Sequence, residues 1–161
     1  MGQITSQESL LLRWAELCAE PQWQDLGDKV ELNGLGVIEM SPAHNRHGKR
    51  QASLAHTLTR DLPHGTVIVQ CSILTTDGIR VPDVAWASFM AVHGDEPTFR
   101  AAPELFVEVR SPSNTDAEMA HKTALYLQAG AVEVRIVDED GAQQVFDRSG
   151  PRAGSGLVAA D

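Results

Sequence analysis

The chain has 161 residues, of which 42% are hydrophobic, and this size and composition suit one globular domain with a single core. The sequence contains neither an apolar run of the ~20 residues that span a bilayer nor the charged and apolar regions of a secretory signal, so we expect a cytoplasmic protein without a membrane partner. A formal net charge of -9 weighs against a constitutive nucleic-acid binder with a basic face, and it is compatible with an acidic cleft that binds cations.

The N-terminal half of the sequence predicts two helices separated by a β-hairpin. A capping-box pattern over 5–8 precedes apolar residues at helical spacing, which predicts a helix over 6–20. Asn33 and Gly34 lie between two runs that are typical of strands, and this pair favours a hairpin turn. The stretch over 41–62 has few apolar residues and stops before a proline, so we expect an amphipathic helix of about five turns with one face in water.

The middle of the chain predicts a pair of strands and a loop. Apolar and β-branched residues predict one strand over 66–74 and a second over 79–88. Asp77 and Gly78 form the turn between them. The glycine and prolines that follow predict a loop over 87–103.

The remaining sequence predicts a strand, a helix and a closing hairpin. The apolar run over 105–109 is typical of a buried strand. The stretch over 115–130 begins with a capping-box pattern and stops at a glycine, which predicts a helix. Strand-like runs on either side of Asp140 and Gly141 predict the hairpin. Because glycine, proline, alanine and serine dominate 149–161, we expect a flexible C-terminal tail there.

This order of elements predicts an α/β fold. We expect a single domain over 1–148, built from a mixed β-sheet of about five to seven strands with helices packed against it. The strand–helix–strand run over 105–137 predicts a crossover connection, and hence a parallel pair of strands at the centre of the sheet.

Three carboxylates occupy positions that call for a chemical explanation. Glu108 lies inside the apolar run, where an unpaired charge costs several kcal/mol unless a cation compensates it. Asp83 follows a proline at the start of a strand segment, and Glu39 closes the strand-like run "GVIEM" at 36–40. Mg²⁺ and Mn²⁺ prefer such hard oxygen ligands, and a bound ion can activate water for phosphodiester hydrolysis. The sequence therefore predicts a site for a divalent cation.

Two cationic side chains could complete this site. Arg110 lies two residues after Glu108, so the two side chains would share a strand face, but arginine cannot be deprotonated and would only bind a phosphate. Lys122 lies in the predicted helix, and because the pKa of lysine falls readily on burial, it could activate the attacking water. Simpler pairings also exist: Arg110 with Glu108, and Lys122 with Glu118 one helical turn earlier.

Four stretches of the sequence together carry a family resemblance. They are "GVIEMSPAHNRHG" at 36–48, "VPDVAWAS" at 81–88, "PELFVEVRSPSNT" at 103–115 and "HKTALYLQAGAVEVRIVD" at 121–138. In this order they resemble the Uma-two family of restriction endonucleases, within the PD-(D/E)XK nuclease superfamily. The resemblance implies a restriction-endonuclease-like core and a divalent-metal-dependent endonuclease that hydrolyses phosphodiester bonds of DNA.

The resemblance also implies roles for individual residues. By position, Asp83 and Glu108 would bind Mg²⁺ or Mn²⁺, with the backbone carbonyl of Val109 as a third ligand. Lys122 matches the catalytic lysine of the superfamily, moved from the strand to the helix. Glu39 matches an upstream acid that often joins such sites. A homodimer would be needed to cut both DNA strands in one encounter.

Two other classes of function stay open. The acidic net charge and the short C-terminus would also suit a catalytically inactive nuclease-like fold that serves as an interaction or regulatory module. His44 and His47 form an HxxH pattern that could bind zinc, although no third ligand follows at a suitable spacing. His47 also matches a histidine in the first long helix of the family. Cys18 and Cys71 form no CxxC pattern, and we expect both thiols to be reduced.

Overall fold

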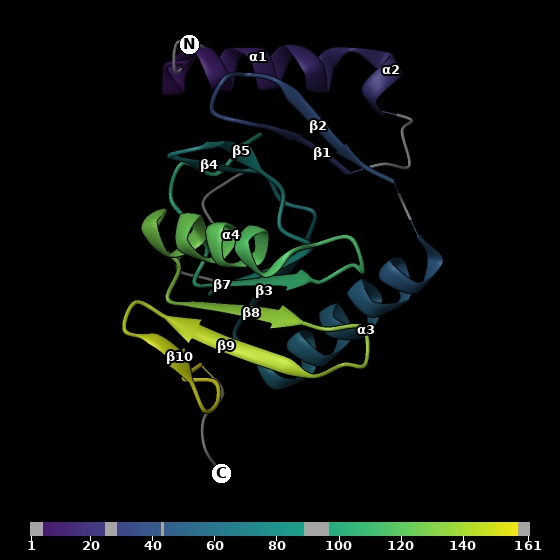
Figure 1. The fold of residues 1–161 in the computed structure, drawn as a ribbon, viewed down its shortest axis with the longest axis vertical. Coiled ribbons are helices and arrows are strands. Elements are labelled where there is room, and N and C mark those ends of the chain that lie inside the picture. Colours follow the sequence, from purple (N-terminus) through teal and green to yellow (C-terminus); the bar gives the residue numbers. More distant parts are fainter. Residues whose placement is uncertain (1–4, 25–28, 43, 89–96, 158–161) are drawn as a thin grey trace.

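Two β-sheets form the framework of the protein, and helices cover them (Figure 1). The computed structural model describes residues 5–24, 29–42, 44–88 and 97–157. The predicted α/β architecture with a mixed sheet is confirmed. None of the described helices combines the length and the apolar character needed to cross a membrane.

The larger sheet is mixed and has the strand order β10-β9-β8-β7-β6-β3. Its central pair, β7 and β8, is parallel, as the predicted crossover required, and the helix between them is α4. The remaining pairs are antiparallel. These elements are β3 (Gly65–Val69), β6 (Val84–Ser88), β7 (Leu105–Val109), α4 (Asp116–Gln128), β8 (Glu133–Val137), β9 (Gln143–Asp147) and β10 (Gly150–Arg152).

The alternation of side chains along the large sheet determines which helix covers each face. Phe106 of β7 packs in one hydrophobic cluster with Tyr126 of α4, whereas Leu105 and Val107 pack in another cluster with Leu58 of α3 (Asn45–Asp61). Helices α3 and α4 therefore lie on opposite faces of the sheet (Figure 1). Because successive side chains of a strand point to opposite faces, Glu108 lies on the α4 side with Phe106.

The smaller sheet is antiparallel, with the order β2-β1-β5-β4, and it packs under the N-terminal helix. The predicted first helix and hairpin are confirmed, and a short helix α2 separates them. Apolar residues of α1 bury Leu32 and Ile79 of this sheet. The elements are α1 (Gln7–Ala19), α2 (Pro21–Gln24), β1 (Lys29–Leu32), β2 (Ile38–Ser41), β4 (Ile73–Thr75) and β5 (Gly78–Arg80).

The two strands predicted over 66–74 and 79–88 are each broken in the structure, and this prediction was wrong. The first divides into β3 and β4, and Gln70 between them has a φ of 54°. The second divides into β5 and β6 at Pro82, which has no N–H to donate to a neighbouring strand. In both cases the chain passes from one sheet to the other, so an apolar run continues while the strand does not.

The C-terminal segment also differs from the prediction. In contrast to the expected tail over 149–161, residues 150–152 form β10 on the edge of the large sheet, and the N–H of Gly156 donates to the buried carboxylate of Glu133 at 2.8 Å. Residues 158–161 lie outside the described residues, as do 89–96 of the predicted loop. The glycine- and proline-rich composition of this segment concealed pairing that depends on backbone groups.

We predict that Gly78→Ala destabilises the protein by ~1–3 kcal/mol in urea unfolding, because the positive φ of Gly78 is unfavourable for alanine. Gly78 has a φ of 91°, and an added Cβ would collide with the backbone oxygen of Leu32 in β1. Gly48→Ala in α3 is the matched control: nothing lies within 4 Å of its added Cβ, and alanine should stabilise the helix by about 0.5–1 kcal/mol. Equal effects of the two substitutions would contradict this account of the turn.

The two cysteines are expected to differ in reactivity. Cys71 is buried in the core beneath α4, and burial raises the pKa of its thiol to about 12, whereas Cys18 is exposed. Because the thiolate is the reactive form, iodoacetamide at pH 8 should modify Cys18 in the native protein and both thiols after denaturation. Mass spectrometry of the modified peptides measures this, and native-state modification of Cys71 would show that the core opens there.

Candidate active site

The break between β5 and β6 places Asp83 where the two sheets meet. Its carboxylate is fully buried and bound on both oxygens. Oδ2 accepts a hydrogen bond from the backbone N–H of Val109 at 2.7 Å. Oδ1 lies 3.0 Å from both His47 Nε2 and Gln51 Nε2, which α3 supplies. These three hydrogen-bond partners hold the carboxylate in one position. An aspartate that only forms a turn at the start of a strand would not need partners from a helix and from a second strand.

Glu108 projects from the centre of the large sheet toward α4, and only 2% of the residue is exposed. Its Oε1 accepts a hydrogen bond from the hydroxyl of Tyr126 at 2.5 Å and lies 3.4 Å from the ammonium of Lys122. Its Oε2 lies 3.2 Å from Lys29 Nζ. Two lysines therefore compensate the buried charge that the apolar sequence context made conspicuous.

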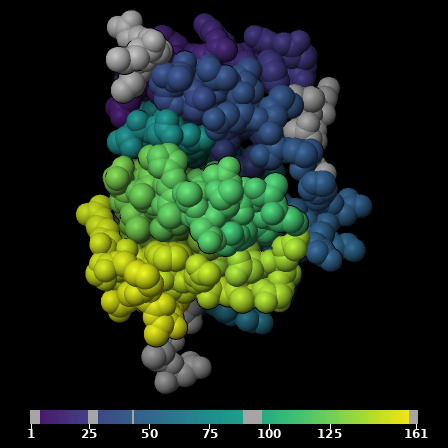
Figure 2. Space-filling view, in the orientation of Figure 1, coloured from purple at the N-terminus to yellow at the C-terminus, as the bar shows by residue number. Residues whose placement is uncertain are grey.

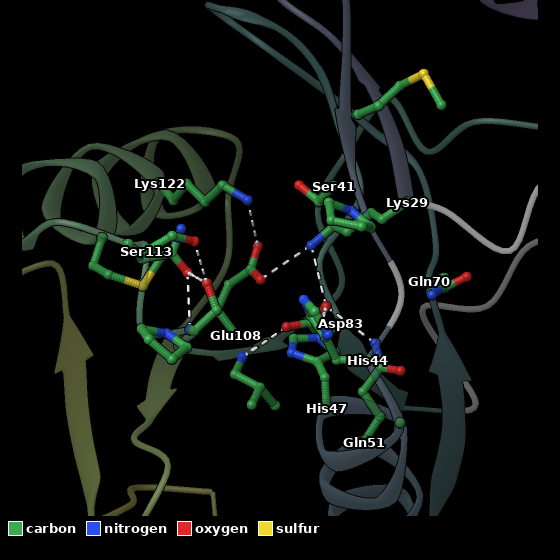
Figure 3. A pocket seen from close by; sticks show the side chains of 18 residues that line it. Lys29, Ser41, His44, His47, Gln51, Gln70, Asp83, Glu108, Ser113 and Lys122 are labelled. Carbon is green, nitrogen blue, oxygen red and sulfur yellow. Dashed lines mark hydrogen bonds and ion pairs between the residues drawn. The ribbon is translucent and has the colours of Figure 1, made fainter.

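Lys29 joins the two carboxylates directly. Its Nζ lies 3.1 Å from Asp83 Oδ1 and 3.2 Å from Glu108 Oε2, so one ammonium bridges both groups (Figure 3). Burial would lower the pKa of Lys29, but the charges of Glu108 and Asp83 raise it above its usual range. Lys29 therefore stays protonated. Lys29 lies 54 and 79 positions before its partners, and no local pattern in the sequence pointed to it.

The two carboxylates differ in their affinity for protons. Burial would raise the pKa of Asp83, but the hydrogen bond with His47 and the charge of Lys29 hold it well below its usual range. Burial raises the pKa of Glu108 above its ordinary value, although Lys122 and Lys29 oppose this. The hydrogen bond to Asp83 in turn raises the pKa of His47. Asp83 is thus the firmly ionised member of the pair.

Lys122 reaches the site from the second turn of α4. Its Nζ lies 3.4 Å from Glu108 Oε1 and 3.5 Å from Glu31 Oε2, whereas Glu118 caps the start of α4 together with Thr115. Glu118 therefore serves the helix cap, and the predicted approach of Lys122 to Glu108 is seen.

Glu39 lies away from the carboxylate pair, and Glu31 is the acid of the hairpin that reaches it. The two are directly opposite in the pairing of β1 with β2, but β2 is the edge strand and β1 the inner one. Glu31 is buried, 3.5 Å from Lys122, and accepts a hydrogen bond from the backbone of Val81 at 2.8 Å. The side chain of Glu39 is 48% exposed and pairs with Arg80 at 2.6 Å. Glu31 reaches the site because it lies on an inner strand, whereas Glu39 lies on the edge strand.

Arg110 also lies apart from Glu108. Strand β7 ends at Val109, so the alternation that would have placed Arg110 on the face of Glu108 does not extend to it. Its guanidinium pairs with Asp116 at 2.5 Å and donates to the backbone oxygen of Asn114. Val109 itself contributes its N–H to Asp83, and a metal-binding role for its carbonyl stays a prediction.

These groups open into a cavity of about 460 Å³ between α3, β2 and α4. The space-filling view shows the surface hollowed between β2 and α4, beside the start of α3 (Figure 2). Ser41, His44, Gln70 and Ser113 add hydroxyl, imidazole and amide groups to its wall (Figure 3). A polar cavity with two convergent carboxylates suits a substrate that is itself polar or charged.

The donor set fits a hard divalent cation through its two carboxylates. Asp83 Oδ1 and Glu108 Oε2 already lie on either side of one cationic group, the Lys29 ammonium. Mg²⁺ is commonly held by one or two carboxylates, with waters and substrate oxygens completing its coordination. Within the described ranges, no group of three or more His, Cys, Asp or Glu side chains converges on one point, and His47 is engaged by Asp83. A divalent ion would have to replace the contacts of Lys29.

A family model matches most of the chain. Residues 14–153 match the model of the Uma2 family, whose description is "Putative restriction endonuclease". The chain belongs to the Uma2 family. No curated protein sequence matches this Uma2 protein significantly.

A solved structure also resembles this Uma2 protein. It is the crystal structure of "a putative nuclease belonging to DUF820" from Anabaena variabilis ATCC 29413. The superposition has a TM-score of 0.60 and covers 80% of this chain and 83% of that chain, with 16% sequence identity. At this identity the likeness establishes a shared fold.

Proposed function

We propose that this protein is a divalent-metal-dependent endonuclease that hydrolyses phosphodiester bonds of DNA. The observation that carries the proposal is the convergence of two buried carboxylates, from separate segments, at one polar cavity. Membership of a family described by endonuclease activity supports it. Asp83 and Glu108 would hold Mg²⁺ or Mn²⁺, which supplies Lewis acidity and offsets the charge of the phosphoryl oxygens when bound.

The surrounding side chains orient the two carboxylates. His47 and Gln51 fix Asp83 from the side of α3, and Tyr126 fixes one oxygen of Glu108 from α4. Side chains that hold a metal-binding carboxylate in place commonly account for 10–100-fold in metal affinity or activity. Lys122, which lies beside Glu108 at the cavity wall, would orient the attacking water and assist the transfer of its proton.

The proposal predicts metal-dependent cleavage by the purified protein. Supercoiled plasmid DNA should be nicked or linearised with Mg²⁺ or Mn²⁺ and remain intact with EDTA, as gel electrophoresis would show. Asp83→Asn should abolish this cleavage, and the heat of Mn²⁺ binding in titration calorimetry should be lost with it. Cleavage that persists in EDTA, or in the Asp83→Asn protein, would contradict the proposal.

A catalytically inactive nuclease-like fold that serves as an interaction module is the second candidate. The position of Lys29 favours it, because the ammonium already compensates the carboxylates that would otherwise recruit a metal. This function predicts no heat of Mn²⁺ binding to the wild-type protein and no cleavage of DNA or RNA. Calorimetry therefore separates the two candidates before any substrate is known.

A further inference from the structure

Positive charge is concentrated on helix α3. The helix contains four lysine or arginine residues and one acidic residue, so it carries a formal charge of +3. The whole chain carries -9, and the residues outside α3 therefore carry -12. A basic helix in an otherwise acidic protein marks a surface that attracts anions.

Three of these basic residues form a stripe on the first turns of α3. The stripe begins at Arg46 and continues with Lys49 and Arg50, which follow it by three and four positions. This spacing places all three residues on one side of a helix. We call these three residues the α3 basic stripe. His47 and Gln51, on the neighbouring side of the same turns, bind Asp83. The stripe therefore lies beside the candidate active site.

The surface between the stripe and the active site is continuous. Arg46 and Arg50 line a second hollow together with His44 and His47, and these two histidines also line the active-site cavity. Hydrogen-bond donors thus extend from the carboxylate pair to the outer side of α3. A chain of phosphates that crosses the cavity would have this surface as its next contact.

The existing partners of the stripe leave it available for phosphates. Arg46 pairs with Glu139 at 3.5 Å while its side chain is 77% exposed, and exposed ion pairs of this kind contribute little free energy. Arg50 donates to the backbone oxygen of Glu139 at 2.7 Å, which holds its guanidinium in place. No carboxylate in the described part of the chain forms an ion pair with the exposed Lys49.

We propose that the α3 basic stripe binds the phosphodiester backbone of the nucleic acid that enters the active site. This inference rests on the proposed function for the identity of the ligand, but it concerns binding and not hydrolysis. Contacts to phosphates carry no sequence information, so the stripe should bind duplex and single-stranded nucleic acids alike and do so in a salt-dependent way.

Fluorescence anisotropy with a labelled 20-base-pair DNA in EDTA tests the proposal without cleavage. Arg46→Glu combined with Lys49→Glu should weaken binding about 10-fold or more at low salt, and the slope of log Kd against log salt should fall by roughly 2. Arg148→Glu combined with Arg152→Glu is the matched control. It makes the same change in charge at the β9–β10 end of the large sheet and should shift Kd less than two-fold.

The result that would overturn the proposal is equal weakening in the two double variants, or none in either. Single-stranded DNA and RNA of the same sequence form parallel arms, and both should lose affinity in the Arg46→Glu, Lys49→Glu protein. Thermal unfolding of both double variants checks that the fold is intact.

Failure of this inference can be distinguished from failure of the proposed function. If the wild-type protein binds DNA through the stripe but never cleaves it with any metal, the stripe stands and the nuclease proposal fails. If the wild-type protein cleaves DNA and the stripe variant binds and cleaves equally well, the stripe alone fails. With both correct, the stripe variant should raise KM for cleavage while kcat changes little, because none of its side chains contacts the carboxylate pair.

Discussion

Glu108→Gln is expected to reduce metal-dependent DNA cleavage by at least ~10²-fold, since loss of even an outer partner of a metal ligand commonly costs 10–100-fold. The substitution keeps the size of the side chain and the acceptor for Tyr126, but it removes the charge that a divalent ion would need. Single-turnover cleavage of a labelled oligonucleotide with Mn²⁺ measures the loss, and calorimetry should show weaker binding of Mn²⁺ by the same protein.

Glu39, the predicted acid that lies outside the carboxylate pair, supplies the control for this experiment. Glu39→Gln changes the same chemical group on the edge strand β2, where Glu39 contacts Arg80 and not the carboxylate pair. Its cleavage rate should stay within about two- to three-fold of the wild type, whereas Glu31→Gln should lower the rate because Glu31 contacts Lys122. A strong defect in Glu39→Gln, with Glu108→Gln fully active, would show that the active site lies elsewhere.

Lys29→Met is expected to destabilise the protein by about 3–5 kcal/mol in the absence of divalent ions, which is the usual cost of breaking a buried ion pair by removing one partner. The substitution leaves Asp83 and Glu108 buried side by side without the ammonium that bridges them. Urea unfolding in EDTA measures the loss as a lower midpoint with an unchanged slope.

Divalent ions should recover part of this stability. With the ammonium gone, Mn²⁺ would meet two uncompensated carboxylates, so the same Mn²⁺ concentration should raise the midpoint of Lys29→Met more than that of the wild type. Lys49→Met removes the same charge at an exposed position of α3, and its stability should change by no more than ~0.5 kcal/mol. If Lys29→Met is as stable as the wild type in EDTA, the bridging contact contributes little to folding.

Local patterns in the sequence were sufficient to predict most of the fold. The predicted capping box starts α4, α1 starts one residue later than its pattern indicated, with Ser6 as the N-cap, and the parallel pair β7–β8 followed from a strand, a helix and a strand in succession. Breaks at Gln70 and Pro82 were missed because each apolar run continues across them. The cause lies in the tertiary structure. One continuous run of residues contributes a strand to each of the two sheets, and the periodicity within the run does not reveal this.

The candidate site could be predicted only where the sequence context of a residue was unusual. Glu108 stood out as a charge inside an apolar strand and Asp83 as an acid after a proline at the start of a strand, and the family resemblance implied roles for both and for Lys122. Lys29 and Glu31 lie in an ordinary amphipathic hairpin strand, where charged residues are common, so their burial emerged only from the packing of the small sheet. Glu39 was singled out and Glu31 was not, because the order of the strands within a sheet cannot be read from the sequence of the hairpin.

The bridge made by Lys29 also has a mechanical consequence. Lys29 belongs to β1 of the small sheet, whereas Glu108 belongs to β7 of the large sheet and Asp83 lies on the connection between the two. The ammonium therefore links the two sheets to each other, in addition to compensating the charge of the carboxylates. A cation that displaced the ammonium would remove this link between the sheets. Amide hydrogen exchange in β1 and β2 should then become faster, while β7 and β8 stay protected.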